Sequence, residues 1–168
     1  MAEMHDFAVR FGGEGGQGVV TASEALAHIA AGVGYHAITF ATFPSQILGG
    51  PTWTQARIAI TPVLSPGDSI DVLVALNEDA YETHKDDVSA GGVVIHDSSF
   101  TPSGNERMIG MPFDDLAKEA GDIRTANMVM MGALSHLVGM PVQYLKDFIV
   151  KRYQARGQAI VDANFKAI

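Results

Sequence analysis

Short apolar runs alternate along this chain with longer segments whose apolar side chains recur every three to four residues. The short runs predict strands, and the longer segments predict helices with one apolar face. The expected strands are residues 6–12, 35–42, 53–60, 70–76, 92–97 and 107–111. The expected helices are residues 16–32, 78–85, 113–120, 126–138 and 141–154, and residues 158–168 also have a helical pattern. This alternation is typical of an α/β layer fold.

A glycine-rich loop stands between the first predicted strand and the first predicted helix. Residues 12–18 read Gly-Gly-Glu-Gly-Gly-Gln-Gly, and Gly13, Gly15 and Gly18 satisfy the spacing G-x-G-x-x-G. Glycines allow a tight turn and a close approach of the backbone to a ligand, and the first N–H groups of a helix attract anions. We therefore predict a three-layer, Rossmann-like open sheet, mostly parallel, that holds a phosphorylated cofactor at this loop.

Two common nucleotide sites fit this loop poorly. An NAD site usually adds an acidic residue about 20 positions further on, and residues 33–40 contain no Asp or Glu. A P-loop needs Gly-Lys-Ser/Thr, whereas Gly18 is followed by Val19 and Val20. A turn that only packs the strand against the helix is the structural alternative. The backbone entropy cost of five glycines in seven residues disfavours it.

Composition narrows the class of protein further. A length of 168 residues with 47% hydrophobic residues favours a single globular domain, and a net charge of −8 argues against a nucleic-acid partner. The absence of cysteine excludes thiolate nucleophiles and iron–sulfur ligation by this chain. The N-terminus lacks a signal-peptide pattern, and the longest apolar stretch, Met128 to Met140, is too short to span a bilayer. We expect a cytoplasmic protein with no membrane contact.

Two further segments are candidates for a phosphate site. Gly49 and Gly50 follow the second predicted strand at its carboxyl end, where ligands gather in open α/β sheets, although an ordinary loop explains them equally well. Arg57 lies in an alternating strand, on the same face as Trp53 and Gln55. Its planar guanidinium suits a phosphate, whereas the simpler interpretation of a lone strand arginine is a surface ion pair.

Other polar residues have structural interpretations. Asn77 stands just before a predicted helix, and Asn127 stands just before the apolar run Met128 to Met131; both are expected to be N-caps. The adjacent acids Asp86 and Asp87 are expected on the solvated surface. The six histidines lack the spacing of a metal site, and the chain has no nucleophile elbow. We therefore predict no catalytic and no metal-binding residue in this chain.

The ordered set of motifs resembles the gamma domain of 2-oxoacid:ferredoxin oxidoreductases of the pyruvate, ketoisovalerate and 2-oxoglutarate type. The segments that carry the resemblance, spread over nearly the whole chain, are residues 13–19, 43–52, 57–58, 71–77, 92–94 and 127–128. These enzymes convert a 2-oxoacid and coenzyme A to acyl-CoA and CO2 and pass electrons to ferredoxin. The resemblance implies that residues 1–168 are one gamma-type domain, either a separate subunit or a part of a gamma–alpha fusion.

Within this family the gamma domain is associated with coenzyme A, so the resemblance implies that the glycine-rich loop, the Gly49-Gly50 turn and Arg57 contact its phosphates. The implied cofactor-binding residues are Gly13, Glu14, Gly15, Gly16, Gln17, Gly18, Gly49, Gly50, Thr52 and Arg57. Thiamine diphosphate, Mg and iron–sulfur clusters are expected on the alpha and beta partners. The chain departs from the family at Gln46 and Leu48, where Glu and Arg are common, which fits a different 2-oxoacid branch or an indolepyruvate-type enzyme.

Two alternatives to coenzyme A binding stay open from the sequence. The first is a non-catalytic structural or assembly domain of the same type of complex, whose loop holds no ligand; Gln46 and Leu48 favour it. The second is a stand-alone nucleotide-binding oxidoreductase, which the missing ribose-binding acid and the missing catalytic set oppose. Titration with nucleotides distinguishes coenzyme A binding from the stand-alone enzyme, and co-purification with thiamine-binding subunits without any ligand affinity would favour the structural domain.

Overall fold

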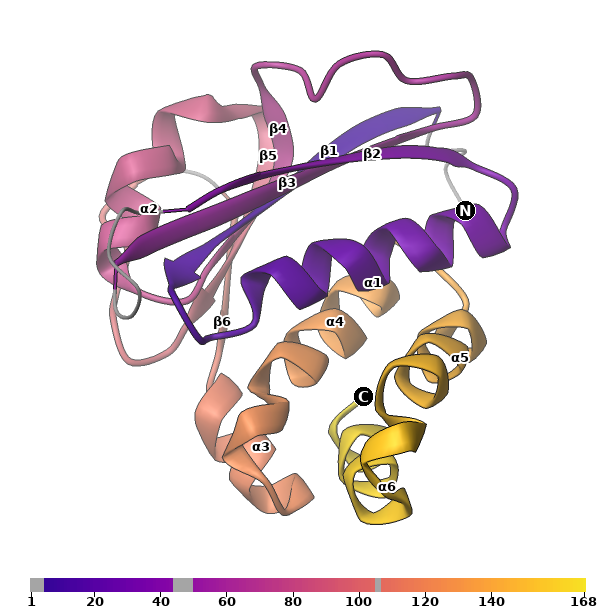
Figure 1. Cartoon of the computed structure of the whole chain (residues 1–168). Helices are drawn as coiled ribbons and strands as arrows, with labels where there is room; N and C mark the ends of the chain where they lie inside the picture. Colours follow the sequence, from indigo (N-terminus) through magenta and orange to yellow (C-terminus); the bar gives the residue numbers. More distant parts are fainter. Residues whose placement is uncertain (1–4, 44–49, 105–106) are drawn as a thin grey trace.

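The computed structural model describes residues 5–43, 50–104 and 107–168. Within these residues, six strands form one sheet in the order β2-β3-β1-β4-β5-β6 (Figure 1). The strands are β1 (Asp6–Glu14), β2 (His36–Thr42), β3 (Pro51–Ala59), β4 (Ile70–Ala75), β5 (Val88–Asp97) and β6 (Arg107–Met111). β1, β4, β5 and β6 pair in parallel, and β3 is antiparallel to both β1 and β2. The sheet is mostly parallel, as predicted, with one reversed strand.

Helices occupy all of the segments that the sequence predicted to be helical. They are α1 (Val19–Gly32), α2 (Glu78–His84), α3 (Phe113–Ala120), α4 (Ala126–Leu137), α5 (Val142–Tyr153) and α6 (Gln158–Ala167). Short 3-10 turns span Lys85–Asp87, Ile123–Thr125 and Gln154–Arg156. The first helix begins at Val19 rather than at residue 16, because Gly18 adopts a left-handed backbone conformation with φ 81°. No helix in the described part of the chain is long and apolar enough to cross a membrane.

The side chains of β1 show how helices cover both faces of the sheet. Phe7, Val9 and Phe11 belong to a large buried cluster that includes residues of α1, α4 and α5. Ala8 points to the other face, where it belongs to a smaller cluster with Tyr81 of α2. This alternation follows from the two-residue period of a strand. The predicted three-layer arrangement is therefore confirmed, with α1 and α4 against one face and α2 against the other.

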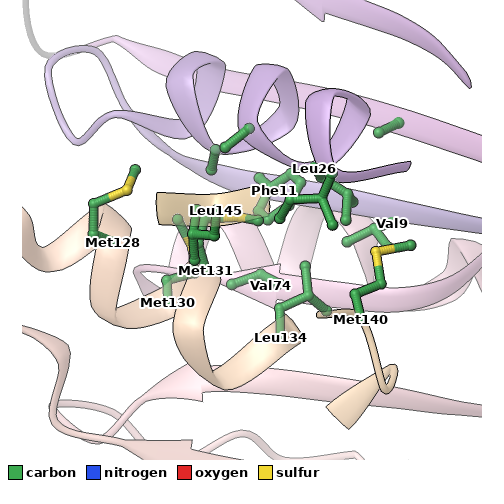
Figure 2. Close-up of a cluster of buried hydrophobic side chains, with 14 of the residues drawn as sticks. Val9, Phe11, Leu26, Val74, Met128, Met130, Met131, Leu134, Met140 and Leu145 are labelled. Atoms are coloured by element: carbon green, nitrogen blue, oxygen red, sulfur yellow. The ribbon is translucent and has the colours of Figure 1, made fainter. Parts of the chain in front are cut away.

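The larger cluster forms the main core, between α1, α4 and the sheet (Figure 2). Leu26 of α1 and Met128, Met130 and Met131 of α4 are fully buried there. α4 is apolar on most of its circumference because α1, α3, α5 and α6 surround it and its buried side chains join the cluster under the sheet. The flexible methionine side chains fill the irregular space between these elements.

The strand order places a crevice next to the glycine-rich loop. From β1 the chain passes through α1 to β2 on one side of the sheet, whereas β4 lies on the other side of β1. Such a reversal separates the loops that leave the carboxyl ends of neighbouring parallel strands, and ligands of open α/β sheets bind there. The glycine-rich loop follows β1 at this point, and Asn77 follows β4.

Candidate ligand-binding site at the carboxyl edge of the sheet

The loop between β1 and α1 is held in shape by its own residues. The backbone N–H of Glu14 donates to the side-chain oxygen Oε1 of Gln17 at 2.6 Å, and the Gln17 N–H donates back to the Glu14 carbonyl at 3.2 Å. Gly18 precedes α1 without a side-chain cap. Within the described residues, the N–H groups of Gly16 and Gly18 have no hydrogen-bond partner. The loop therefore offers backbone donors to a ligand.

The start of β3 comes to the same place, so Gly50 and Thr52 lie beside the loop. The Gly15 N–H donates to the Gly50 carbonyl at 3.0 Å, and Thr52 lies opposite Gly13 in the β1–β3 register. The buried Thr52 hydroxyl donates to the same Gly50 carbonyl at 3.3 Å. Gly49 lies outside the described residues, as do Gln46 and Leu48.

Arg57 is not brought to the loop. It lies opposite Ala8, six residues before Glu14 on β1, which places it about 20 Å from the loop along the strand. Its guanidinium makes a two-pronged ion pair with Asp6, with N–O distances of 2.9 and 2.7 Å. Hydrogen bonding to this guanidinium lowers the pKa of the Asp6 carboxyl below its usual value. Arg57 does share one strand face with Trp53 and Gln55, as predicted. It lies farther along β3, however, near the end of the sheet opposite the loop.

Among the described residues, two clefts open beside the loop. The first, which we call the α4-side cleft, has a volume of about 680 Å³, and its lining includes Gly16, Gln17, Leu76, Asp97 and Asn127. The second, the α2-side cleft, has a volume of about 630 Å³, and its lining includes Gly13, Glu14, Thr52, Trp53 and His84. The predicted binding residues are therefore divided between two sides: the end of β1 faces α2, and the middle of the loop faces α4.

The two clefts differ in charge. The ionisable residues that line the α4-side cleft are Asp97, Asp114, Asp115, Lys118 and Arg124, which gives a formal charge of −1. Those that line the α2-side cleft are Glu14, Asp79, Glu82 and His84, which gives −3 when the histidine is neutral. An anionic ligand is repelled less in the α4-side cleft. Among the described residues, no group of three or more acidic or histidine side chains is placed to hold a metal ion.

A buried arginine lies behind the lining of the α2-side cleft. Arg10, in the middle of β1, donates to Gln55 Oε1 at 3.0 and 2.7 Å and lies 4.6 Å from the ring centre of Trp53. It also faces His84 Nδ1 at 3.1 Å and donates to the Asp87 carboxylate. Burial, followed by the Arg10 charge, lowers the pKa of His84 to about 4. The neutral ring therefore accepts a hydrogen bond from the guanidinium.

The sequence analysis did not single out Arg10, and it expected Asp87 on the solvated surface. Asp87 does lie at the surface, with its side chain 44% exposed, and its carboxylate also pairs with the buried Arg10, which the sequence analysis did not foresee. One signal for this network was available: Arg10 interrupts the apolar run from Phe7 to Phe11. A charged side chain in a buried strand needs a partner, so a polar network was to be expected there.

The prediction that Asn127 is an N-cap is wrong, whereas the same prediction for Asn77 is confirmed. Asn77 Oδ1 accepts the Ala80 N–H at 2.8 Å and caps α2. Asn127 is the second residue of α4 rather than its cap. The 3-10 turn Ile123–Thr125 precedes the helix, and the side chain of Asp122 caps that turn. Asn127 is free of this role, and its buried side chain lines the α4-side cleft.

Comparison with known proteins identifies the family. Residues 8–168 match the family described as pyruvate ferredoxin/flavodoxin oxidoreductase, and the chain belongs to this family. It is 32% identical, over 172 aligned residues, to ketoisovalerate oxidoreductase subunit VorA of Methanothermobacter marburgensis. That alignment covers 99% of this chain and 36% of VorA, so the chain spans about a third of the length of this relative.

Solved structures of similar proteins agree in fold. One is 2-oxoglutarate:ferredoxin oxidoreductase from Magnetococcus marinus with 2-oxoglutarate, coenzyme A and succinyl-CoA bound, with a TM-score of 0.90 and 32% identity over 98% of this chain and 30% of that one. Another is the gamma subunit of a keto/oxoacid ferredoxin oxidoreductase from Geobacter sulfurreducens PCA, with a TM-score of 0.84 and 28% identity. The latter alignment covers 96% of this chain and 91% of the subunit.

Proposed function

We propose that this chain is the gamma component of a 2-oxoacid:ferredoxin oxidoreductase and that it binds and positions coenzyme A. The observation that carries the proposal is the glycine-rich loop, which presents free N–H groups at the carboxyl edge of the sheet in a chain of this family. Support also comes from the related Magnetococcus marinus enzyme, whose structure holds coenzyme A.

Such a component contributes position rather than a reacting side chain. Holding coenzyme A by its phosphates keeps the thiol at a high local concentration near the acyl group that it accepts. The 2-oxoacid is decarboxylated on partner subunits or domains, which would carry thiamine diphosphate, Mg and the iron–sulfur clusters and would deliver electrons to ferredoxin. This chain has no cysteine and thus no thiolate to hold a cluster.

The binding set in this proposal is the loop from Gly13 to Gly18 together with Gly50 and Thr52, with Gly49 beside them in the sequence. Arg57 has no place in it, because its guanidinium is paired with Asp6 toward the other edge of the sheet. The loop N–H groups are suited to the phosphates because they supply donors without a carboxylate partner.

A matched pair of glycine variants tests this proposal. Gly16 (φ 103°) and Gly34 (φ 87°) are exposed, both have a left-handed backbone, and neither has an atom within 4 Å of an added Cβ. Alanine strains both positions by about 1–2 kcal/mol. Gly16→Ala is expected to weaken coenzyme A binding about tenfold by turning the loop N–H groups, whereas Gly34→Ala, at the far end of α1, leaves binding unchanged.

The measurement is isothermal titration calorimetry of the assembled oxidoreductase with coenzyme A, with NAD and FMN as control ligands. Saturable binding of coenzyme A alone, weakened by Gly16→Ala only, supports the proposal. Binding of NAD or FMN in its place would indicate a conventional nucleotide-dependent enzyme. An assembled complex that binds none of the three would leave this chain a structural domain of the complex.

A further inference from the structure

The α4-side cleft contains a buried polar side chain without a partner. Asn127 is 7% exposed, and within the described residues its amide makes no hydrogen bond. The neighbouring polar residues are satisfied: the Thr125 hydroxyl donates to the Asp122 carbonyl at 2.7 Å, and Asp97 accepts the Phe113 N–H at 3.2 Å. The amide atoms of Asn127 are not fully enclosed, because the residue lines the cleft. Asn127 therefore has unused hydrogen-bonding capacity where the cleft is open.

The amide of Asn127 lies directly against the glycine-rich loop. A Cβ atom added to Gly18 would stand only 2.6 Å from Asn127 Nδ2 and 2.9 Å from Asn127 Cγ. Any side chain at position 18 would have to displace the amide, in addition to straining the left-handed backbone there. The close approach brings the amide, the N-cap of α1 and the first turn of α4 together.

The surroundings favour an anion at this point. The first turns of α1 and α4 both carry partial positive charge, and the free N–H groups of Gly16 and Gly18 belong to the same loop. Lys118, which is paired with Asp115, and Arg124 line the same cleft, whereas among the described residues no lysine or arginine lines the α2-side cleft. Arg124 is already paired with Asp122, whose pKa it lowers to about 2 by hydrogen bonding. Because Arg124 is already paired, the neutral amide of Asn127 is the side-chain donor that lies next to the free backbone N–H groups of the loop.

We propose that Asn127 contacts a phosphate group of coenzyme A in the α4-side cleft, by donating from Nδ2 to a phosphate oxygen beside Gly16 and Gly18. The inference rests on the proposed function and adds to it the choice of cleft and a contact residue from outside the two glycine segments. The acidic α2-side cleft would hold either the uncharged parts of coenzyme A or solvent.

Two substitutions of Asn127 separate a ligand contact from a structural role. Asn127→Ala removes the donor and is expected to weaken coenzyme A binding about 10- to 100-fold, as for loss of a hydrogen bond to a charged group. Asn127→Asp preserves the shape but faces the phosphate with a carboxylate. It is expected to weaken binding more than alanine does, and raising the salt concentration should restore part of the loss. A structural role would lower the melting temperature of both variants without changing their affinity.

The experiment is calorimetric titration of the assembled oxidoreductase with coenzyme A, using Asn164→Asp and Glu82→Gln as controls. Asn164 is also buried, but its amide donates to the Ile160 carbonyl at 2.7 Å within α6, so its replacement should not change affinity. Glu82 lines the α2-side cleft, and tighter binding by Glu82→Gln would place the phosphate there and overturn the inference. Wild-type affinity in both Asn127 variants would overturn it too, with the proposed function intact. Failure of the wild-type complex to bind coenzyme A would refute the proposed function itself.

Discussion

Replacing His84 with glutamine is predicted to remove a large part of the pH dependence of stability. The His84 side chain is 7% exposed, and burial beside Arg10 lowers its pKa from 6.5 to about 4. The unfolded chain takes up the proton near pH 6.5, whereas the folded protein resists it until about pH 4. Stability from the neutral ring is therefore complete above the unfolded pKa and is lost as the pH falls toward the folded one. Between about pH 7.5 and about pH 5 the loss is about 2 kcal/mol.

The assay is urea unfolding at these two pH values, followed by the fluorescence of Trp53, the single tryptophan. Its ring lies 5.4 Å from the His84 ring, so the probe reports on this network directly. Glutamine at position 84 retains a hydrogen-bond acceptor for Arg10 but does not titrate. His36→Gln, which changes an exposed histidine on β2, is the control and should keep the wild-type pH dependence. If His84→Gln loses as much stability on acidification as the wild-type protein, the reasoning about the buried ring is refuted.

Three further predictions concern stability and the limits of the site. Leu26→Ala, in the main core between α1 and the sheet, should lower the free energy of unfolding by about 2–5 kcal/mol in urea titrations; a loss below about 1 kcal/mol would contradict the packing. Asn77→Ala removes the cap of α2 and should cost about 1 kcal/mol, whereas Asn77→Asp, which keeps the acceptor for Ala80, should retain most of the stability. Arg57→Ala should change stability by less than about 1 kcal/mol and leave coenzyme A affinity unchanged; a loss of affinity would restore Arg57 to the binding set.

The strand, loop and helix around the glycines were predictable because the signals are local. The apolar run that ends at Phe11 predicts the strand, and the five closely spaced glycines that follow predict a loop. The Ala-rich stretch after Gly18 predicts α1. Two boundaries differ from the prediction: β1 continues to Glu14 rather than ending at residue 12, and the left-handed conformation of Gly18 delays the start of α1 to Val19.

The position of Arg57 was not predictable because it depends on strand direction and register. β3 runs antiparallel to β1, so its start meets the glycine-rich loop and its later residues, Arg57 among them, move away from it. Thr52 and Arg57 are only five positions apart, but one is buried beside the loop and the other is paired with Asp6. The two-residue period of the strand predicted the face of the sheet on which Arg57 lies, but it gave no information about which end of the sheet Arg57 is near.

Asn127 illustrates a second limit of the sequence. An asparagine just before the apolar run Met128 to Met131 has the pattern of an N-cap, but α4 begins at Ala126, so Asn127 is already inside its first turn. The contact between Asn127 and Gly18 joins residues 109 positions apart in the chain. Only the packing of α4 beside α1 brings this contact about.

Hydrogen exchange of the assembled oxidoreductase, with and without coenzyme A, tests the central claim most directly. The account predicts that coenzyme A slows exchange in the loop from Glu14 to Gly18 and in the first turn of α4, with little change around Arg57. Unchanged exchange in the loop, or protection confined to the α2-side cleft, would contradict the account.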